Sequence, residues 1–282
     1  MITLTDISYA YPDAEHFALE KVDLHVAAGE ILGIVGASGA GKTTLAKVIA
    51  GFIPHVEGGE LSGTVIVDGA DVRELKLADA VAKVGLVIQN PFNQISGAKY
   101  TVRDEIAFGL ENLGVPRDEM LERVPAAAEL LGVTHLLDRS PYDLSGGQQQ
   151  LVAIASMVVL RTPVLVMDEP TSQLDPAGTR MVFDVLSALR ESGTTIVVLE
   201  HKVELLREHC DRIAVIARET IAADGPPRDI LSDERMQDWG IGATRYTDAA
   251  RAAGTRGLLP AAFEMPVSLD EAAALFSAGG AA

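Results

Sequence analysis

The 282-residue sequence has few thiols and few basic residues. It contains one cysteine, Cys210, which excludes an internal disulfide and is typical of a protein from a reducing compartment. Lysines and arginines number 23 against 40 aspartates and glutamates, so the formal net charge is −17. Because affinity for nucleic acid depends largely on basic side chains that contact phosphates, this charge argues against a nucleic-acid partner. It does not exclude a local basic patch.

The sequence also lacks a long hydrophobic run. The longest apolar stretch, residues 151–160, is roughly half the length of a membrane-spanning helix. Residues 1–6 have no basic segment followed by an apolar one, so we do not expect an export signal there. If the protein works at a membrane, we therefore expect a partner to hold it there. With 48% hydrophobic residues the chain can bury a full core, as one large domain or two smaller ones.

Apolar runs and helical spacing alternate along the chain and predict an α/β fold. Residues 31–35 form a nearly continuous apolar run that ends in glycines, as expected for a buried parallel strand, and the residues after Thr43 have helical spacing. Further strands are predicted at 3–10, 18–26, 65–67, 84–89, 164–167, 195–199 and 212–216, and a helix at 180–189.

Strand signals disappear in the middle of the chain. Helices are predicted there at 102–110, 117–131 and 148–160, which indicates a helical subdomain at about 90–161. This subdomain is inserted into a domain that we place at 1–225. A C-terminal extension follows at 226–282, with helices expected near Asp248 and Asp270.

A glycine-rich segment between the strand at 31–35 and the following helix matches the phosphate-binding loop G-x-x-x-x-G-K-[ST]. The match consists of Gly36, Ala37, Ser38, Gly39, Ala40, Gly41, Lys42 and Thr43. Its glycines allow backbone N–H groups to converge on phosphate oxygens, and the helix start adds partial positive charge. We expect Lys42 to neutralise the β- and γ-phosphates, Thr43 to bind Mg²⁺, and Thr44 to lie at the same site. The sequence thus predicts ATP with Mg²⁺.

Two acids follow the apolar run at 164–167. Asp168 would lie at the carboxyl edge of the sheet, where it can help to hold Mg²⁺. Glu169 lies one residue further on, where it can activate a water molecule as general base. A pair of acids after a strand is by itself usually a solvated turn, but the phosphate-binding loop favours the functional interpretation.

Leu144-Ser145-Gly146-Gly147-Gln148 matches the signature sequence of the ABC ATPases, and the chain resembles this family over about residues 1–225. Physically, Ser145 and the amides of Gly146 and Gly147 can form an anion cradle at a helix start. The resemblance implies that this cradle, with Gln148, faces the γ-phosphate held by a second cassette. It also implies a P-loop (RecA-like) ABC nucleotide-binding domain with an antiparallel β subdomain and the inserted α-helical subdomain.

Further positions match this family in the same order along the chain. Tyr11 fits the aromatic residue that stacks on adenine, and Gln89 fits the glutamine that reaches Mg²⁺ and water and senses the membrane partner. Asp175 fits the loop that crosses the dimer interface, and His201 fits the switch histidine on the γ-phosphate. The resemblance therefore implies catalytic roles for Lys42, Gln89, Glu169 and His201, and Mg²⁺ binding by Thr43, Gln89 and Asp168. The other five histidines match no motif and are expected to be solvent-exposed.

Residues 89–94 and 102–114 are similar to the energy-coupling-factor branch, whose ATPases drive prokaryotic uptake of vitamins or transition-metal ions. Leu199-Glu200-His201, in place of the commoner Thr-His-Asp, and the tail from Leu259 resemble one half of fused double-cassette members. The resemblance implies an ATP-hydrolysing transporter subunit, peripheral at the cytoplasmic face of the cell membrane. Its implied partners are a second ABC ATPase subunit, identical or paralogous, a transmembrane coupling component and a substrate-binding membrane component. The sequence does not identify the solute.

Two other functions stay open. A soluble ABC ATPase acting on DNA or ribosomes is disfavoured by the acidic charge, the single cassette and the lack of coiled-coil heptads between Gly36 and Ser145. A non-hydrolysing partner cassette that binds ATP is disfavoured by the intact Glu169 and His201. Leu151 keeps that second function open, because the family usually has arginine at this position, which braces the helix behind the signature. The substitution either weakens coupling across the dimer or is harmless.

Overall fold

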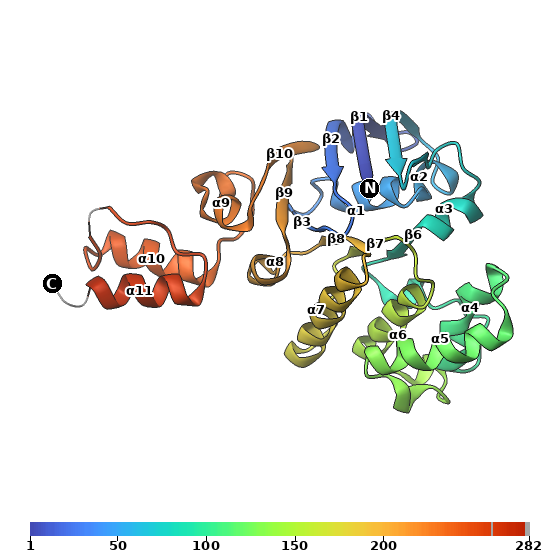
Figure 1. Ribbon diagram of the computed structural model, residues 1–282. Helices are drawn as coiled ribbons and strands as arrows, with labels where there is room; N and C mark the ends of the chain where they lie inside the picture. The colour runs from blue at the N-terminus through green and yellow to red at the C-terminus, as the bar shows by residue number, and fades with distance from the viewer. Residues whose placement is uncertain (261, 280–282) are drawn as a thin grey trace.

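A six-stranded sheet forms the centre of the protein, which the computed structural model describes for residues 1–260 and 262–279 (Figure 1). The strand order is β10-β9-β3-β8-β7-β6, and every neighbouring pair is parallel except β9 and β10. All residues of β3, β7 and β8 are buried, as expected for parallel strands covered on both faces. The strands are β3 (Ile31–Val35), β6 (Val84–Val87), β7 (Val164–Asp168), β8 (Thr195–Leu199), β9 (Arg212–Ala217) and β10 (Thr220–Gly225).

A second, antiparallel sheet lies over one side of the central sheet. Its strand order is β2-β1-β4-β5. Its strands are β1 (Ile2–Ala10), β2 (Leu19–Val26), β4 (Glu60–Val67) and β5 (Ala70–Asp71). The antiparallel β subdomain implied by the family resemblance is therefore present.

Strand β3 shows how the two faces of the central sheet are packed. Ile31 and Val35 belong to a buried cluster shared with the helical block, whereas Leu32 and Ile34 belong to a cluster shared with the antiparallel sheet. Successive side chains of a strand point to opposite faces, so a short apolar strand contributes to both cores. The loop that follows β3 consequently leaves from a strand fixed on both sides.

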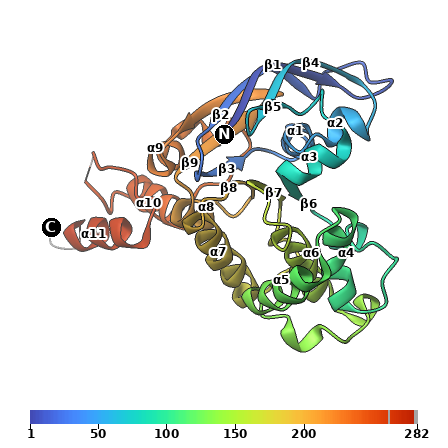
Figure 2. The ribbon, with the colours of Figure 1, turned by 45° about the vertical axis from the view of Figure 1, so that its right-hand side comes forward.

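After β6 the chain leaves the central sheet, forms three long helices and returns to the sheet at β7 (Figures 1 and 2). In both views this block (green) and the antiparallel sheet (blue) lie on opposite sides of the central sheet. The block contains α4 (Val102–Asn112), α5 (Arg117–Leu130) and α6 (Gly146–Val158). The helices outside it that precede residue 226 are α1 (Lys42–Ile49), α2 (Phe52–His55), α3 (Leu77–Lys83), α7 (Pro176–Glu191) and α8 (Val203–His209).

The chain after β10 is helical and extends from one edge of the molecule (orange to red in Figure 1). Its helices are α9 (Pro227–Ser232), α10 (Arg245–Thr255) and α11 (Leu269–Gly279). Ile230, Leu231 and Met236 belong to the same buried cluster as the central sheet, so the start of this segment packs on the core. The division of the chain at residues 225 and 226 stays a prediction.

The predicted strands and long helices are present, with shifted ends. Helix α6 begins at Gly146 rather than 148 and α7 at Pro176 rather than 180, because Ser145 and Asp175 cap their first turns. The elements α3, α8 and β10 were not predicted, because they have six or seven residues each and therefore little periodicity.

The expectation that all five remaining histidines are solvent-exposed is wrong for two of them. His55 is half-buried, with its Nε2 atom 2.8 Å from the Val72 carbonyl oxygen. His209 is half-buried against the ring of Phe183, at 4.7 Å between centroids. Both side chains make local contacts with the fold.

Candidate nucleotide-binding site

The phosphate-binding loop connects β3 to α1, and its backbone requires glycine at two positions. A Cβ atom at Gly36 would lie 2.4 Å from the Ile216 carbonyl oxygen. Gly41 has a φ of +100°, and a Cβ atom there would lie 2.5 Å from the Ala18 carbonyl oxygen. The loop is therefore packed between β9 and the chain before β2, and side chains would force it apart.

Lys42 closes the loop from its inner side. The Lys42 Nζ atom donates hydrogen bonds to the carbonyl oxygens of Gly36 (2.8 Å) and Ala37 (3.0 Å). Burial lowers the pKa of this ammonium group, while the nearby carboxylates of Glu169 and Asp168 oppose that shift. The amine thus lies beneath the loop, where the β- and γ-phosphates of a nucleotide are expected.

Thr43 and Asp168 meet although 125 positions of sequence separate them. The Thr43 hydroxyl donates a 2.6 Å hydrogen bond to Asp168 Oδ2. Asp168 is only 2% exposed, and its other oxygen, Oδ1, is buried without a hydrogen-bond partner. Burial raises the pKa of this carboxyl, and the bond from Thr43 opposes the shift. A buried oxygen that lacks a partner is costly unless a ligand satisfies it.

This pair fits a magnesium ion. Mg²⁺ prefers oxygen ligands, usually takes one or two carboxylates and completes its shell with water and substrate phosphates. The described residues contain no group of three or more His, Cys, Asp or Glu side chains that could hold a metal by themselves. A hydroxyl and one carboxylate beside a phosphate-binding loop match the sparse protein contribution that Mg²⁺ needs.

Glu169 is held by residues from two other loops. Its Oε2 atom accepts a 2.7 Å hydrogen bond from Gln89 Nε2, and its Oε1 atom lies 3.0 Å from His201 Nε2. The Glu169 backbone has a φ of +48°, a conformation uncommon for a residue with a side chain. The structure therefore brings together the four residues for which catalytic roles were predicted: Lys42, Gln89, Glu169 and His201.

Tyr11 and Thr44 contact each other beside the loop. The Tyr11 hydroxyl lies 3.0 Å from Thr44 Oγ1, and the Tyr11 ring packs edge-on against Tyr9 at 4.9 Å between centroids. Thr44 is buried. Stacking of Tyr11 on adenine and contact of Thr44 with nucleotide stay predictions.

The signature segment is organised separately from this cluster. Ser145 caps α6 in a reciprocal pair with Gln148, with hydrogen bonds of 3.0 and 3.4 Å. Ser145 and Gly146 are exposed, and Gly147 packs against the backbone of Gln173. Within residues 1–260 and 262–279, no hydrogen bond joins this segment to the phosphate-binding loop. Asp175 likewise acts locally, since its Oδ1 atom accepts a 2.7 Å bond from Gly178 N.

Leu151, where the family usually has arginine, is half-buried on α6 and packs against the buried cluster of the helical block. A leucine satisfies this apolar contact.

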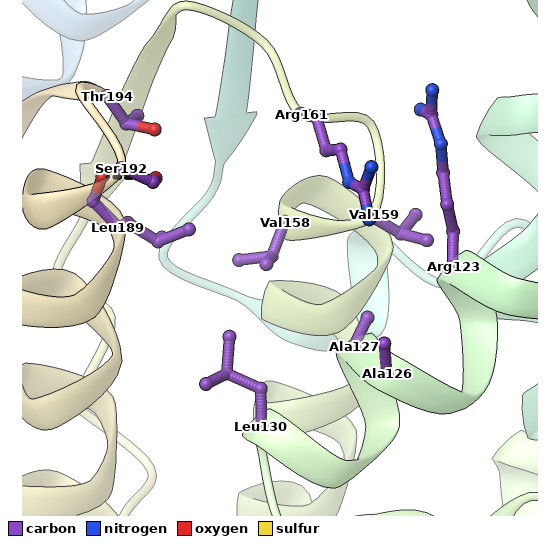
Figure 3. Close-up of a pocket in the computed structure, with 10 residues that line it drawn as sticks. All are labelled: Arg123, Ala126, Ala127, Leu130, Val158, Val159, Arg161, Leu189, Ser192 and Thr194. Carbon is purple, nitrogen blue, oxygen red and sulfur yellow. Dashed lines mark hydrogen bonds between the residues drawn. The ribbon is translucent and has the colours of Figure 1, made fainter.

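A cavity of about 500 Å³ lies between α5, α6 and α7 (Figure 3). Arg123 extends from α5 and Arg161 from the loop after α6, and Leu130, Val158 and Leu189 point into the gap between the helices. No residue of the phosphate-binding loop or of the acid pair lines it. This cavity is therefore separate from the candidate nucleotide site.

The fold and the site define a P-loop nucleotide-binding protein. A family model described as ABC transporter matches residues 19–172, more than half of the chain, so the chain belongs to this family. The energy-coupling factor transporter ATP-binding protein EcfA1 of Lacticaseibacillus paracasei is 44% identical over 233 residues, which cover 82% of this chain and 81% of that protein.

Two solved structures are similar to the chain. The structure of cbiO1 from Clostridium perfringens, part of the ABC transporter complex cbiONQ, has a TM-score of 0.72 at 27% identity and covers 90% of this chain and 94% of that chain. The ATP-binding cassette MJ0796, solved as a dimer in a post-hydrolysis state with ADP and Pi, has a TM-score of 0.71 at 26% identity. That match covers 80% of this chain and 99% of that one.

The chain is thus an ABC-type ATPase and the ATP-binding subunit of a transporter, which confirms the predicted family, fold class and enzymatic activity. Among the described residues, no helix is both long and apolar enough to cross a membrane.

Proposed function

We propose that this chain hydrolyses MgATP for an energy-coupling-factor-type transporter that takes up a vitamin or a transition-metal ion. The observation that carries the catalytic part is the convergence of Gln89 and His201 on the Glu169 carboxylate, next to the Thr43–Asp168 pair. The EcfA1 relative and the order of the motifs along the chain support the transporter class.

Separate residues bind the phosphates, activate the water molecule and hold Mg²⁺. Backbone amides of residues 36–43 bind the phosphates, and Lys42 exchanges its carbonyl partners for phosphate oxygens. Glu169 orients the attacking water and accepts its proton, while Gln89 and His201 fix the direction of its carboxylate. Thr43, Asp168 and Gln89 would hold Mg²⁺, which neutralises phosphate charge.

The complete site contains residues of two cassettes. Ser145, Gly146, Gly147 and Gln148 are expected to bind the γ-phosphate held by a second ABC ATPase subunit, identical or paralogous. Their exposure and their position at a helix start support this role, because free N–H groups and partial positive charge are available there. Asp175 is expected to lie at the same interface, and Tyr11 to stack on adenine.

The transmembrane coupling component is expected to dock beside Gln89 and the helical block, at the cytoplasmic face of the membrane, in a groove that reaches Gln94, whose Oε1 atom accepts a 3.1 Å hydrogen bond from Ile88 N. This groove, a cavity of about 430 Å³, lies between α3, α4 and α6. Leu77, Val81 and Leu113 line it and are exposed apolar side chains. The acidic chain suits a partner with basic residues, which are enriched at the cytoplasmic face.

Coexpression with candidate membrane components, followed by purification of the complex in detergent, tests the proposal. Leu77→Asp should reduce recovery of the complex by about tenfold, because it places a charge in the apolar groove. It should not unfold α3, since an acid at the first helical position is favourable. Leu121→Asp is the matched control, because Leu121 is 62% exposed on α5 and does not line this groove.

Calorimetry of the isolated subunit with candidate vitamins and metal ions should show no solute binding, because the solute is expected to bind the membrane component. Tight solute binding by this chain alone would contradict the proposal, and so would stable association with DNA or ribosomes. Equal recovery of the Leu77→Asp and Leu121→Asp complexes would contradict docking in the groove.

A further inference from the structure

Glu200 is a buried acid between the end of β8 and His201. Its side chain belongs to a residue only 3% exposed. A carboxylate is rarely buried so completely unless specific partners satisfy both of its oxygens. The partners of Glu200 lie on its own loop, at His201, and on the segment 171–175 that follows Glu169.

The two carboxylate oxygens of Glu200 accept hydrogen bonds from different residues. Glu200 Oε1 accepts hydrogen bonds from the hydroxyl (2.6 Å) and the backbone N–H (3.2 Å) of Thr171. Glu200 Oε2 accepts a 3.2 Å bond from the backbone N–H of His201. Thr171 lies two residues after Glu169 and opens the segment that ends at Asp175.

Lys202 completes this arrangement. Its Nζ atom donates to Thr171 Oγ1 at 2.9 Å and to the Thr171 carbonyl oxygen at 3.1 Å. The Thr171 hydroxyl therefore donates to Glu200 and accepts from Lys202, which fixes its orientation. Thr171 is fully buried, so its hydroxyl is shielded from water.

Glu200, Thr171 and Lys202 lie where the pairing of β7 with β8 ends, and this position gives their hydrogen bonds a structural role. Strands β7 and β8 are paired up to Asp168 and Leu199, and one further backbone bond joins Glu169 N to the Leu199 oxygen. Beyond that point Glu169 and His201 lie on separate loops, although their side chains must stay 3.0 Å apart. The Glu200–Thr171 bonds continue the connection between those loops where the ladder ends.

We infer that Glu200 is a positioning residue that locks the His201 loop to the segment 171–175, through Thr171, and so fixes the geometry of Glu169 and His201 for hydrolysis. This inference rests on the proposed function, because it assumes that Glu169 and His201 act on the attacking water and the γ-phosphate. It predicts that the Glu200–Thr171 pair affects turnover and leaves nucleotide affinity unchanged.

Matched variants test the hydroxyl–carboxylate link. Thr171→Val removes the hydroxyl at nearly constant volume, Thr171→Ser retains it, and Glu200→Gln retains the shape but cannot accept at both oxygens. Thr171→Val and Glu200→Gln should each lower kcat by about tenfold or more, with the Kd for ATP within about twofold of the parent value. Thr171→Ser should recover most of the turnover. Glu122→Gln, on the exposed side of α5, is the charge-matched control and should change neither quantity.

The double variant sharpens the test. If one link is broken by either change, Thr171→Val combined with Glu200→Gln should lower kcat about as much as one change alone. Additive losses would overturn the inference, and so would a kcat within twofold of the parent for both single variants, whatever happens to Tm. Should Glu200→Gln fail to fold, the Thr171→Val and Thr171→Ser pair decides the question.

Glu169→Gln and His201→Ala in the same assay separate this inference from the proposed function. If these two retain turnover, the proposed catalytic site is wrong. If they lose turnover while the Thr171 and Glu200 variants do not, the positioning role alone is wrong.

Discussion

The predicted nucleotide site has two parts, which are stabilised by different kinds of hydrogen bond. One is the phosphate-binding loop with Gln89, Asp168, Glu169 and His201, and the other is the signature segment at 144–148. In the first region, hydrogen bonds join residues that are far apart in sequence, such as Thr43 to Asp168 and Gln89 to Glu169. In the second, Ser145 pairs with Gln148, three residues further along the same helix.

The two regions also differ in exposure. Lys42 and Asp168 are buried and have pKa values shifted by that burial, whereas Ser145 and Gly146 face solvent. The first region is assembled within one chain. The second is a helix cap whose expected ligand must come from outside, which is why a partner cassette is required for its proposed role.

The first predicted change removes the general base, Glu169, from the region that is assembled within one chain. Glu169→Gln should lower turnover by at least about a hundredfold, because it removes the general base and leaves the phosphate-binding groups in place. ATP binding should persist, and ATP should drive a dimer visible by size-exclusion chromatography, since the closed state cannot hydrolyse its nucleotide. Turnover within a few-fold of the parent, with the partner complex present, would contradict the role of Glu169.

A change in the exposed signature segment should affect only the site of the opposite subunit in the dimer. Ser145→Arg should abolish hydrolysis without weakening ATP binding to the isolated subunit, as measured by fluorescent-nucleotide titration and an ATPase assay on one preparation. Lys42→Ala is the contrasting variant, and we expect it to weaken ATP binding to the isolated subunit by about tenfold or more, because a buried charge contact to phosphate is lost. Loss of affinity in the Ser145 variant would mean that Ser145 belongs to its own subunit's site.

The smallest predicted effect concerns the thermal stability of the subunit without nucleotide, which depends on the buried Asp168. The pKa of Asp168 is raised above its ordinary value, mainly by burial, so its ionised form costs free energy in the folded protein. This cost is absent below the unfolded pKa and grows as the pH rises through the folded pKa. Asp168→Asn should therefore raise Tm at pH 7 by roughly 2–4 °C.

The pH dependence provides the check on that prediction. By thermal unfolding of the nucleotide-free subunit, the gain from Asp168→Asn should be smaller at an acidic pH, where the aspartate is protonated, than at pH 7. Asp184→Asn, at an exposed position of α7, is the control and should show no such trend. A gain that is equal at both pH values would contradict burial of the charge as its cause.

The contiguous parts of the site can be identified from the sequence alone. The phosphate-binding loop, the acid pair and the signature are each readable because their residue types follow one another at fixed spacing. Apolar runs such as 31–35 and 164–167 likewise predicted buried strands, since a strand covered on both faces has no polar positions. Short elements such as α3 and β10 escaped prediction because they hold too few residues to show a period.

Which of these parts meet depends on how the strands are ordered in the folded chain. The strand order places β3 between β9 and β8, and β8 beside β7, so that the loops after these strands converge on one edge. That order brings Thr43 to Asp168, and Gln89 and His201 to Glu169, and it left Asp168 Oδ1 without a partner. It also revealed the bond between Glu200 and Thr171, which no local pattern encodes, because such contacts depend on how distant strands are paired.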